Sequence, residues 1–190
     1  MSKPTRFAHV VYRTRRFEQM LQWYTEVFEA RFQLNNGVIA FMTYDDEHHR
    51  FAFVNLGAIA PDGPALQHPS TATVEHVAYT FGSLTDLLEN YARLQAAGIV
   101  PYWAIHHGIT ISLYYHDPDG NQMEFQVDCL GSNELANAYM HGPNFAANPI
   151  GVEFDPDAIL AALRGGTPET AFSARPGGPQ SPIRTALNPR

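Results

Sequence analysis

The sequence predicts an α+β fold in which two paired βαβββ modules form a cupped mixed sheet around a metal cavity, followed by an irregular C-terminal arm. Three observations predict it. The first half of the chain is repeated in the second, apolar runs alternate with turn residues, and 190 residues that are 45% hydrophobic can bury one good core. We therefore expect a two-module domain over 1–130 and a C-terminal extension over 131–190.

The internal repeat is visible in the strand and helix that open each half. A β-branched and aromatic run surrounds His9, and a similar run surrounds His76, 67 positions later. The same offset relates four apolar positions at helical spacing, which are Phe17 and Leu84, Met20 and Leu87, Leu21 and Leu88, and Tyr24 and Tyr91. A strand, a His and four helix positions held in one register indicate a duplicated structural unit. Module one is placed at about 5–57, the linker at about 58–72 and module two at about 73–129.

After each helix the sequence returns to runs with strand character. In the first module two such runs flank a polar segment, and in the second module two runs flank the turn sequence Asp-Pro-Asp-Gly. The predicted strands are 38–44, 50–55, 109–116 and 122–128. We expect Gly37 and Gly98 to mark the transitions from helix to strand.

The C-terminal extension repeats neither module. Asp155 and Pro156 are a typical N-cap and first helical residue, which predicts a short helix over about 156–164. Apolar anchors between Pro and Gly turns indicate that about 140–155 covers the cavity mouth or a dimer partner. After Gly165 the chain is rich in Pro and Gly, and we expect it to be extended or held by a second subunit.

Composition excludes several classes of protein. The formal net charge is −7 and the basic residues cluster only at 13–16, so no nucleic-acid partner is expected. Cys129 is the single cysteine, which excludes a disulfide framework and a thiolate metal site. No signal-like segment or 18-residue apolar run is present, so we expect no membrane association and a cytoplasmic location.

The duplication also suggests a metal site. Equivalent positions in paired modules place His9 and His76 toward one cavity, and Glu124 can join them from a third strand. Two imidazoles and one carboxylate are the facial triad that leaves open positions on Fe(II). The alternative interpretation is that both histidines are ordinary core residues and that Glu124 is a solvated strand carboxylate.

The sequence also resembles a known protein family. The two-module pattern, His107-Gly108-Ile109-Thr110 and the run from Leu113 through Asp117-Pro118-Asp119-Gly120-Asn121 to Glu124 are similar to the type I extradiol ring-cleaving catechol dioxygenases of the vicinal oxygen chelate superfamily. The resemblance covers roughly 6–128. It implies Fe(II)-dependent cleavage of a small aromatic diol by O2 to a ring-opened semialdehyde-type product, with Mn(II) as an alternative metal and a homo-oligomeric assembly.

The resemblance also implies roles for individual residues. The metal ligands would be His9, His76 and Glu124. His49 would be the acid/base His, with neighbouring His48 as the alternative. Substrate oxygens would be bound by His107, with His106 as the alternative, and by Tyr114.

Other functions of the same superfamily stay open at this point. A glyoxalase-like isomerase or a thiol transferase typically takes a fourth protein ligand from the last strand of the first module. Here residues 50–55 have apolar side chains where a carboxylate would be required. A non-catalytic small-molecule-binding module is a further alternative, although it would not require the set His9, His76 and Glu124.

The implied chemistry constrains the second hairpin. A four-residue loop would place Tyr114 and Glu124 on opposite faces of the sheet, because neighbouring side chains alternate along a strand. A five-residue loop, Asp117 to Asn121, instead pairs His116 with Gln122 and sets Tyr114 directly opposite Glu124. We predict the five-residue loop.

Overall fold

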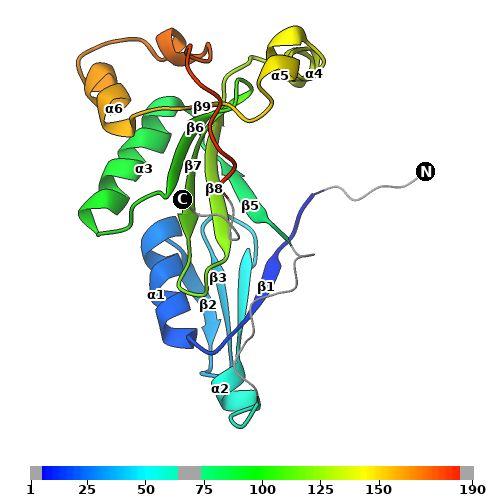
Figure 1. Ribbon diagram of the computed structural model, residues 1–190. Helices are drawn as coiled ribbons and strands as arrows, with labels where there is room; N and C mark the ends of the chain where they lie inside the picture. Colours follow the sequence, from blue (N-terminus) through cyan, green and yellow to red (C-terminus); the bar gives the residue numbers. More distant parts are fainter. Residues whose placement is uncertain (1–5, 64–73, 185–190) are drawn as a thin grey trace. The chain divides into compact units, whose positions relative to one another are not determined.

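The computed structural model describes residues 6–63 and 74–184, which divide between two compact units (Figure 1). The first unit is Met1–Thr73 with Asp117–Asp119, and the second is Val74–His116 with Gly120–Arg190. Each unit contains one mixed sheet with helices, which confirms the predicted α+β class. The C-terminal extension belongs to the same unit as the second module.

The first unit has the predicted βαβββ order. Its sheet has the strand order β1-β4-β3-β2, in which β1 is parallel to β4 and the other pairs are antiparallel. The strands are β1 (Val10–Thr14), β2 (Arg31–Asn35), β3 (Ile39–Thr43) and β4 (Phe51–Asn55). The helices are α1 (Phe17–Phe28) and the short α2 (Leu56–Ile59). Residues 64–73, which include most of the predicted linker, lie outside the described part of the chain.

Helix α1 packs its apolar stripe on this sheet. Tyr24 is fully buried, and its ring centroid lies 4.7 Å from that of Phe51 and 4.8 Å from that of Phe53 on β4. Both ring pairs meet edge-on, the arrangement that aromatic quadrupoles favour. The predicted helical register around Tyr24 is therefore the one that forms the core of this unit.

Two sequence expectations need correction in the first unit. The run around His9 becomes a strand only from Val10 onward. Before it, Arg50 Nη1 donates to the carbonyls of Phe7 (2.6 Å) and Ala8 (3.0 Å), so a side chain takes the place of strand pairing. His9 thus lies just before the strand. Gly37, with φ of 78°, lies in the turn between β2 and β3, whereas α1 ends at Phe28 and has Glu29 as its C-cap.

The second unit repeats the βαβββ order and adds one strand from the C-terminal extension. Its sheet has the order β5-β8-β7-β6-β9, with β5 parallel to β8 and the other pairs antiparallel. The strands are β5 (His76–Thr80), β6 (Trp103–His106), β7 (Thr110–His116), β8 (Gln122–Asp128) and β9 (Val152–Glu153), and the helix of the repeat is α3 (Leu84–Ala96). Gly98, with φ of 79°, follows α3 as predicted.

The two faces of this second sheet differ in chemistry. Alternate residues of β7 and β8 on one face, such as Leu113, Met123 and Phe125, are buried apolar side chains. The residues between them, Tyr114 and Glu124, belong to the opposite face. This opposite face carries a smaller buried cluster of Trp103, Ile105 and Tyr114, and the Glu124 carboxylate lies on the same face.

The C-terminal extension has more regular structure than the sequence predicts. It contains α4 (Asn133–Met140), α5 (Pro143–Ala147), β9, α6 (Pro156–Arg164) and a 3-10 turn, η1 (Glu169–Phe172). Helix α4, which was not predicted, begins at an N-cap, since the Ser132 hydroxyl accepts a hydrogen bond from the Leu135 amide. Helix α6 lies beside α3 (Figure 1), and Arg164 forms a bidentate ion pair with Glu89 there.

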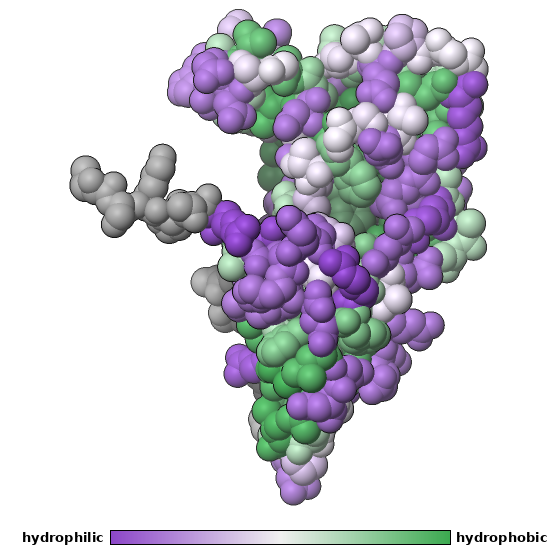
Figure 2. All heavy atoms as spheres, turned by 180° about the vertical axis from the view of Figure 1, so that it is seen from behind, coloured by the Kyte–Doolittle hydropathy of each residue, from purple (hydrophilic) through white to green (hydrophobic). Residues whose placement is uncertain are grey.

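The surface of the first unit carries exposed apolar side chains, and Figure 2 shows hydrophobic residues gathered over it. They include Val11, Phe32, Leu34 and Val38 from its strands and strand ends. Among the described residues, no helix combines the length and apolar character that crossing a membrane requires.

Candidate active site

The hairpin of β7 and β8 is the framework of the candidate site, and its register confirms the five-residue loop. His116 pairs with Gln122, and Tyr114 pairs with Glu124. The loop is shaped by Asp117, whose Oδ1 accepts the Asp119 amide at 3.0 Å, and by Gly120, whose φ of 85° disfavours other residues. Tyr114 and Glu124 consequently share one sheet face.

His76 joins Glu124 on that face. Strand β5 runs parallel to β8, and His76 Nε2 lies 3.0 Å from Glu124 Oε2. The hydrogen bond that His76 donates to the Glu124 carboxylate raises the pKa of the His76 imidazole, against the opposing effect of burial. Two of the three predicted metal ligands are therefore in direct contact.

Glu124 is held as a carboxylate although it is 6% exposed. Burial acts to raise the pKa of Glu124, but hydrogen bonds from His76, Ser112 and Tyr114 outweigh it and leave that pKa below its usual value. A buried, ionised carboxylate beside an imidazole is a donor pair that suits a divalent transition metal. This chemistry fits the predicted metal site.

Tyr114 connects Glu124 to His107. The Tyr114 hydroxyl lies 3.1 Å from His107 Nε2, and burial followed by the charge of Glu124 raises the Tyr114 pKa. His107 Nδ1 lies 2.5 Å from the carbonyl oxygen of Ile150, which precedes β9. Burial lowers the pKa of His107, so this imidazole is neutral near pH 7. The four side chains form a continuous line from His76 to His107.

The structure separates the two candidates His106 and His107. The His106 side chain is 3% exposed, its Nε2 contacts the Phe172 carbonyl at 3.0 Å, and its Nδ1 accepts the Gly108 amide at 3.0 Å. His106 thus holds the C-terminal extension, and burial lowers its pKa. Only His107 reaches Tyr114.

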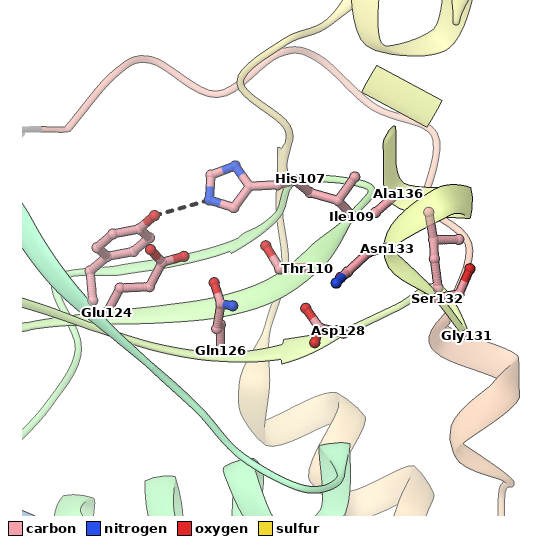
Figure 3. Close-up of a pocket in the computed structure, with 12 residues that line it drawn as sticks. His107, Ile109, Thr110, Glu124, Gln126, Asp128, Gly131, Ser132, Asn133 and Ala136 are labelled. Atoms are coloured by element: carbon pink, nitrogen blue, oxygen red, sulfur yellow. Dashed lines mark hydrogen bonds between the residues drawn. The ribbon is translucent and has the colours of Figure 1, made fainter. Parts of the chain in front are cut away.

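A pocket of about 600 Å³ opens beside this line of side chains, and Figure 3 shows His107, Glu124 and Gln126 directed toward it. Its far end is polar and is formed by the start of β7, the end of β8 and the start of α4. The residues there include Thr110, Asp128, Ser132 and Asn133. The pocket can therefore accept a small molecule whose one end meets Tyr114 and whose other end meets polar groups.

The remaining predicted residues form a cluster in the first unit. The ring centroids of His9 and His49 are 4.3 Å apart, and the His49 ring stacks on Phe41 with centroids 4.6 Å apart. Burial, followed by the charges of His9 and His48, lowers the pKa of His49. His48 is also adjacent, with its Nδ1 2.6 Å from His49 Nδ1, but its side chain is 70% exposed.

The predicted triad is divided between the two units, with His9 in the first and His76 and Glu124 in the second. Over residues 6–63 and 74–184, no three His, Cys, Asp or Glu side chains are grouped as metal ligands would be. The complete triad remains a prediction. The structure supplies the His76 and Glu124 pair and the His9 and His49 pair.

Some contributors were not predicted as site residues. The Trp103 ring packs against Tyr114 with centroids 5.0 Å apart, and its Nε1 donates to Ser181 in the C-terminal extension at 3.0 Å. The contact between the Ile150 carbonyl and His107 could not be predicted from the sequence, since every residue type has a backbone oxygen.

Comparison with known proteins places this geometry in context. Residues 6–125 match the family described as the Glyoxalase/Bleomycin resistance protein/Dioxygenase superfamily. The chain is 45% identical over 168 residues to biphenyl-2,3-diol 1,2-dioxygenase 2 of Rhodococcus globerulus, which covers 88% of this chain and 86% of the relative. It is 38% identical over 177 residues to biphenyl-2,3-diol 1,2-dioxygenase 3 of the same organism, which covers 92% and 90% respectively.

Solved structures share the fold at lower identity. A glyoxalase/bleomycin resistance protein/dioxygenase from Nocardioides has a TM-score of 0.54 and 21% identity, covering 70% of this chain and 88% of its own. The fosfomycin resistance protein FosX from Mesorhizobium loti has a TM-score of 0.51 and 18% identity, covering 71% and 99%. At these identities the likeness concerns the fold alone.

Proposed function

Because this chain belongs to the Glyoxalase/Bleomycin resistance protein/Dioxygenase superfamily, we propose that it is an extradiol dioxygenase that uses O2 to open the ring of a catechol-type aromatic diol. Two relatives that span most of the chain are named as biphenyl-2,3-diol 1,2-dioxygenases. The observation that carries the proposal is the line of contacts from His76 through Glu124 and Tyr114 to His107 beside one pocket. The enzyme class is accordingly an oxidoreductase that incorporates both oxygen atoms.

The metal is proposed to be Fe(II), with Mn(II) as the alternative. His76 and Glu124 would bind it together with His9, and the metal would supply open positions for the diol and O2. The support is chemical. Glu124 is a buried carboxylate, and burial acts to raise its pKa, but hydrogen bonds from His76 and Ser112 keep that pKa below its usual value. Such a carboxylate can replace hydrogen bonds by metal coordination without first losing a proton.

The residues around the diol would have separate tasks. Tyr114 donates a hydrogen bond to a diol oxygen, and its raised pKa keeps it protonated for that task. His107 is neutral near pH 7, because burial lowers its pKa, and its Nε2 can accept a proton from the same region. His49, whose pKa burial also lowers, would act as the acid/base residue next to the proposed ligand His9.

The alternative activities of the superfamily receive less support. An isomerase or transferase with a fourth protein ligand would require a carboxylate on β4, and the inner residues of that strand are Phe51, Ala52, Phe53 and Val54. All four are apolar. We also propose a cytoplasmic location, a homo-oligomer and a division into a domain over 1–130 and an extension over 131–190.

The decisive experiment measures metal, oxygen and product together. Protein purified and handled without air should contain close to one Fe(II) per chain. After a catechol-type diol is added in air, it should consume one O2 per diol and give a yellow ring-opened semialdehyde. A protein that is fully loaded with Fe(II), binds the diol and consumes no O2 with any diol tested would refute the proposed function.

A further inference from the structure

The proton on the Tyr114 hydroxyl has two acceptors within reach. One is His107 Nε2, 3.1 Å away, and the other is the carboxylate of Glu124, which also forms a hydrogen bond with Tyr114. A phenol donates only one proton, so it serves one acceptor at a time. Which of the two ring nitrogens of neutral His107 carries the hydrogen decides which acceptor Tyr114 serves.

A backbone carbonyl determines this tautomer of His107. His107 Nδ1 lies 2.5 Å from the Ile150 carbonyl oxygen, which accepts and cannot donate, so Nδ1 must carry the hydrogen. In a neutral imidazole the other nitrogen, Nε2, then holds a lone pair and accepts from Tyr114. If Nε2 carried the hydrogen, it would donate to Tyr114, and Tyr114 would in turn donate to Glu124. The Ile150 carbonyl thus selects between two hydrogen-bond directions.

The Ile150 carbonyl is held by a compact turn in the C-terminal extension. Asn148 Oδ1 accepts the amides of Ile150 (3.2 Å) and Gly151 (2.7 Å), and Asn148 Nδ2 donates to the Gly151 carbonyl at 3.1 Å. Arg175 Nη1 donates to the Asn148 carbonyl at 2.6 Å. A single Asn side chain therefore fixes the peptide units on both sides of Ile150.

The turn also fits closely over β6. Gly151 has φ of 125°, and a Cβ built on it would lie 2.5 Å from the His106 carbonyl oxygen, so only glycine permits this approach. The next residue, Val152, pairs with His106 in the sheet. The turn is thereby tied to the residue that immediately precedes His107 in the chain.

We propose that Asn148 and Arg175 are positioning residues that, through the Ile150 carbonyl, fix the Nδ1-protonated tautomer of His107, so that before a diol binds Tyr114 donates to His107 and not to Glu124. The Glu124 carboxylate then has more lone pairs available for His76 and a metal. His107 Nε2 keeps a lone pair that can accept a proton. The kinetic part of this inference rests on the proposed dioxygenase function, and the tautomer itself does not. Hydrogen-bond partners outside the ligand set commonly change metal affinity or activity 10- to 100-fold.

The experiment reads the tautomer directly. In the full-length protein labelled with ¹⁵N-histidine and loaded with diamagnetic Zn(II), the ring nitrogens of His107, assigned with H107N, should show hydrogen on Nδ1. N148A should give a mixture of tautomers, and with Fe(II) its kcat should fall about tenfold with KM for the diol within about twofold. N148D keeps the acceptor oxygen and should recover part of kcat.

Controls separate this role from general destabilisation. N144A changes a neighbouring Asn that contributes only its backbone carbonyl to Arg175, and it should leave both tautomer and kcat unchanged. If N148A does not fold, as judged by far-UV circular dichroism, R175M provides the second variant.

Two results would overturn the inference: hydrogen on His107 Nε2 in the unaltered protein, or a fall in kcat in N148A while His107 keeps a single Nδ1-protonated tautomer. Loss of the proposed function would look different, because no diol would be turned over while His107 retained the Nδ1 hydrogen.

Discussion

The imidazole rings of His9 and His49 lie 4.3 Å apart between centroids, and the His49 ring also stacks on Phe41. A proposed metal ligand and a proposed acid/base residue are therefore neighbours within one unit, although 40 positions separate them in the sequence. His48 has no such packing on Phe41 and is exposed. The pair supports His49 as the proton-transfer residue.

The first prediction tests that choice. H49F should retain Fe(II) and bind the diol but open the ring about 10²-fold more slowly or worse, because general acid/base catalysis contributes about 10²–10⁴-fold. Rapid-mixing absorbance would follow the diol and the product separately. H48F is the matched control and should stay within about threefold of the unaltered enzyme. A larger loss in H48F than in H49F would assign the role to His48.

The second prediction concerns the metal ligands. H9A, H76A and E124A should each retain less than about a tenth of the Fe(II) bound by the unaltered protein, since each removes one of three protein ligands. Metal content after gel filtration without air is the measurement, and far-UV circular dichroism checks the fold. E89A, which removes a surface partner of Arg164, should keep its iron. Stoichiometric iron in any one ligand variant would remove that residue from the site.

The sequence predicted the parts of the site that depend on strand parity. Tyr114 stands opposite Glu124 because a five-residue loop sets the register, and residue alternation then fixes the shared face. The repeat at a constant offset similarly predicted that His9 and His76 open equivalent strands, although β1 begins one residue after His9. Periodicity and turn chemistry are local properties, so they can be read from the chain.

The contributions of the C-terminal extension could not be predicted in this way. The Ile150 carbonyl contacts His107, and Ser181 accepts a hydrogen bond from Trp103 across 78 positions of sequence. Neither contact has a period or a motif, because a backbone oxygen and a lone serine occur everywhere in proteins. The N-cap at Ser132 did have a sequence signal, a serine followed by Asn-Glu-Leu. Because α4 lacks a strong apolar stripe, residue periodicity did not indicate a helix there.

The third prediction concerns substrate choice at the far end of the pocket. Asn133 and Asp128 make this end polar, so a diol substituent that forms hydrogen bonds should be favoured there over an alkyl group of the same size. N133L should lower KM for an alkyl-substituted diol and raise it for a hydroxyalkyl one, changing the ratio of kcat/KM by about tenfold. L135A is the matched control, since Leu135 lies two residues further along α4, is 56% exposed and does not line the pocket. An unchanged ratio in N133L would place the substituent elsewhere.

The last prediction concerns stability and pH at the start of α3. Glu169 of η1 accepts the amides of Leu84 (3.1 Å) and Thr85 (2.9 Å), and its carboxylate also accepts the Thr85 hydroxyl. The hydrogen bond from the Thr85 side chain is the main cause that lowers the Glu169 pKa. A carboxylate at a helix N-terminus also interacts favourably with the helix dipole.

A folded-state pKa below the unfolded value means that this stabilisation is fully present above the unfolded pKa, about 4.3, and is lost as pH falls through the folded pKa. E169Q should therefore lower the free energy of unfolding by about 0.5–1 kcal/mol at pH 7 and by progressively less below about pH 4. Urea unfolding at several pH values measures it. S83A is the matched control, because the Ser83 hydroxyl caps the same helix through the Asp86 amide at 3.0 Å and has no charge to titrate. Its cost should stay constant with pH, and an E169Q cost that is equally constant would show that the carboxylate charge contributes nothing at this helix end.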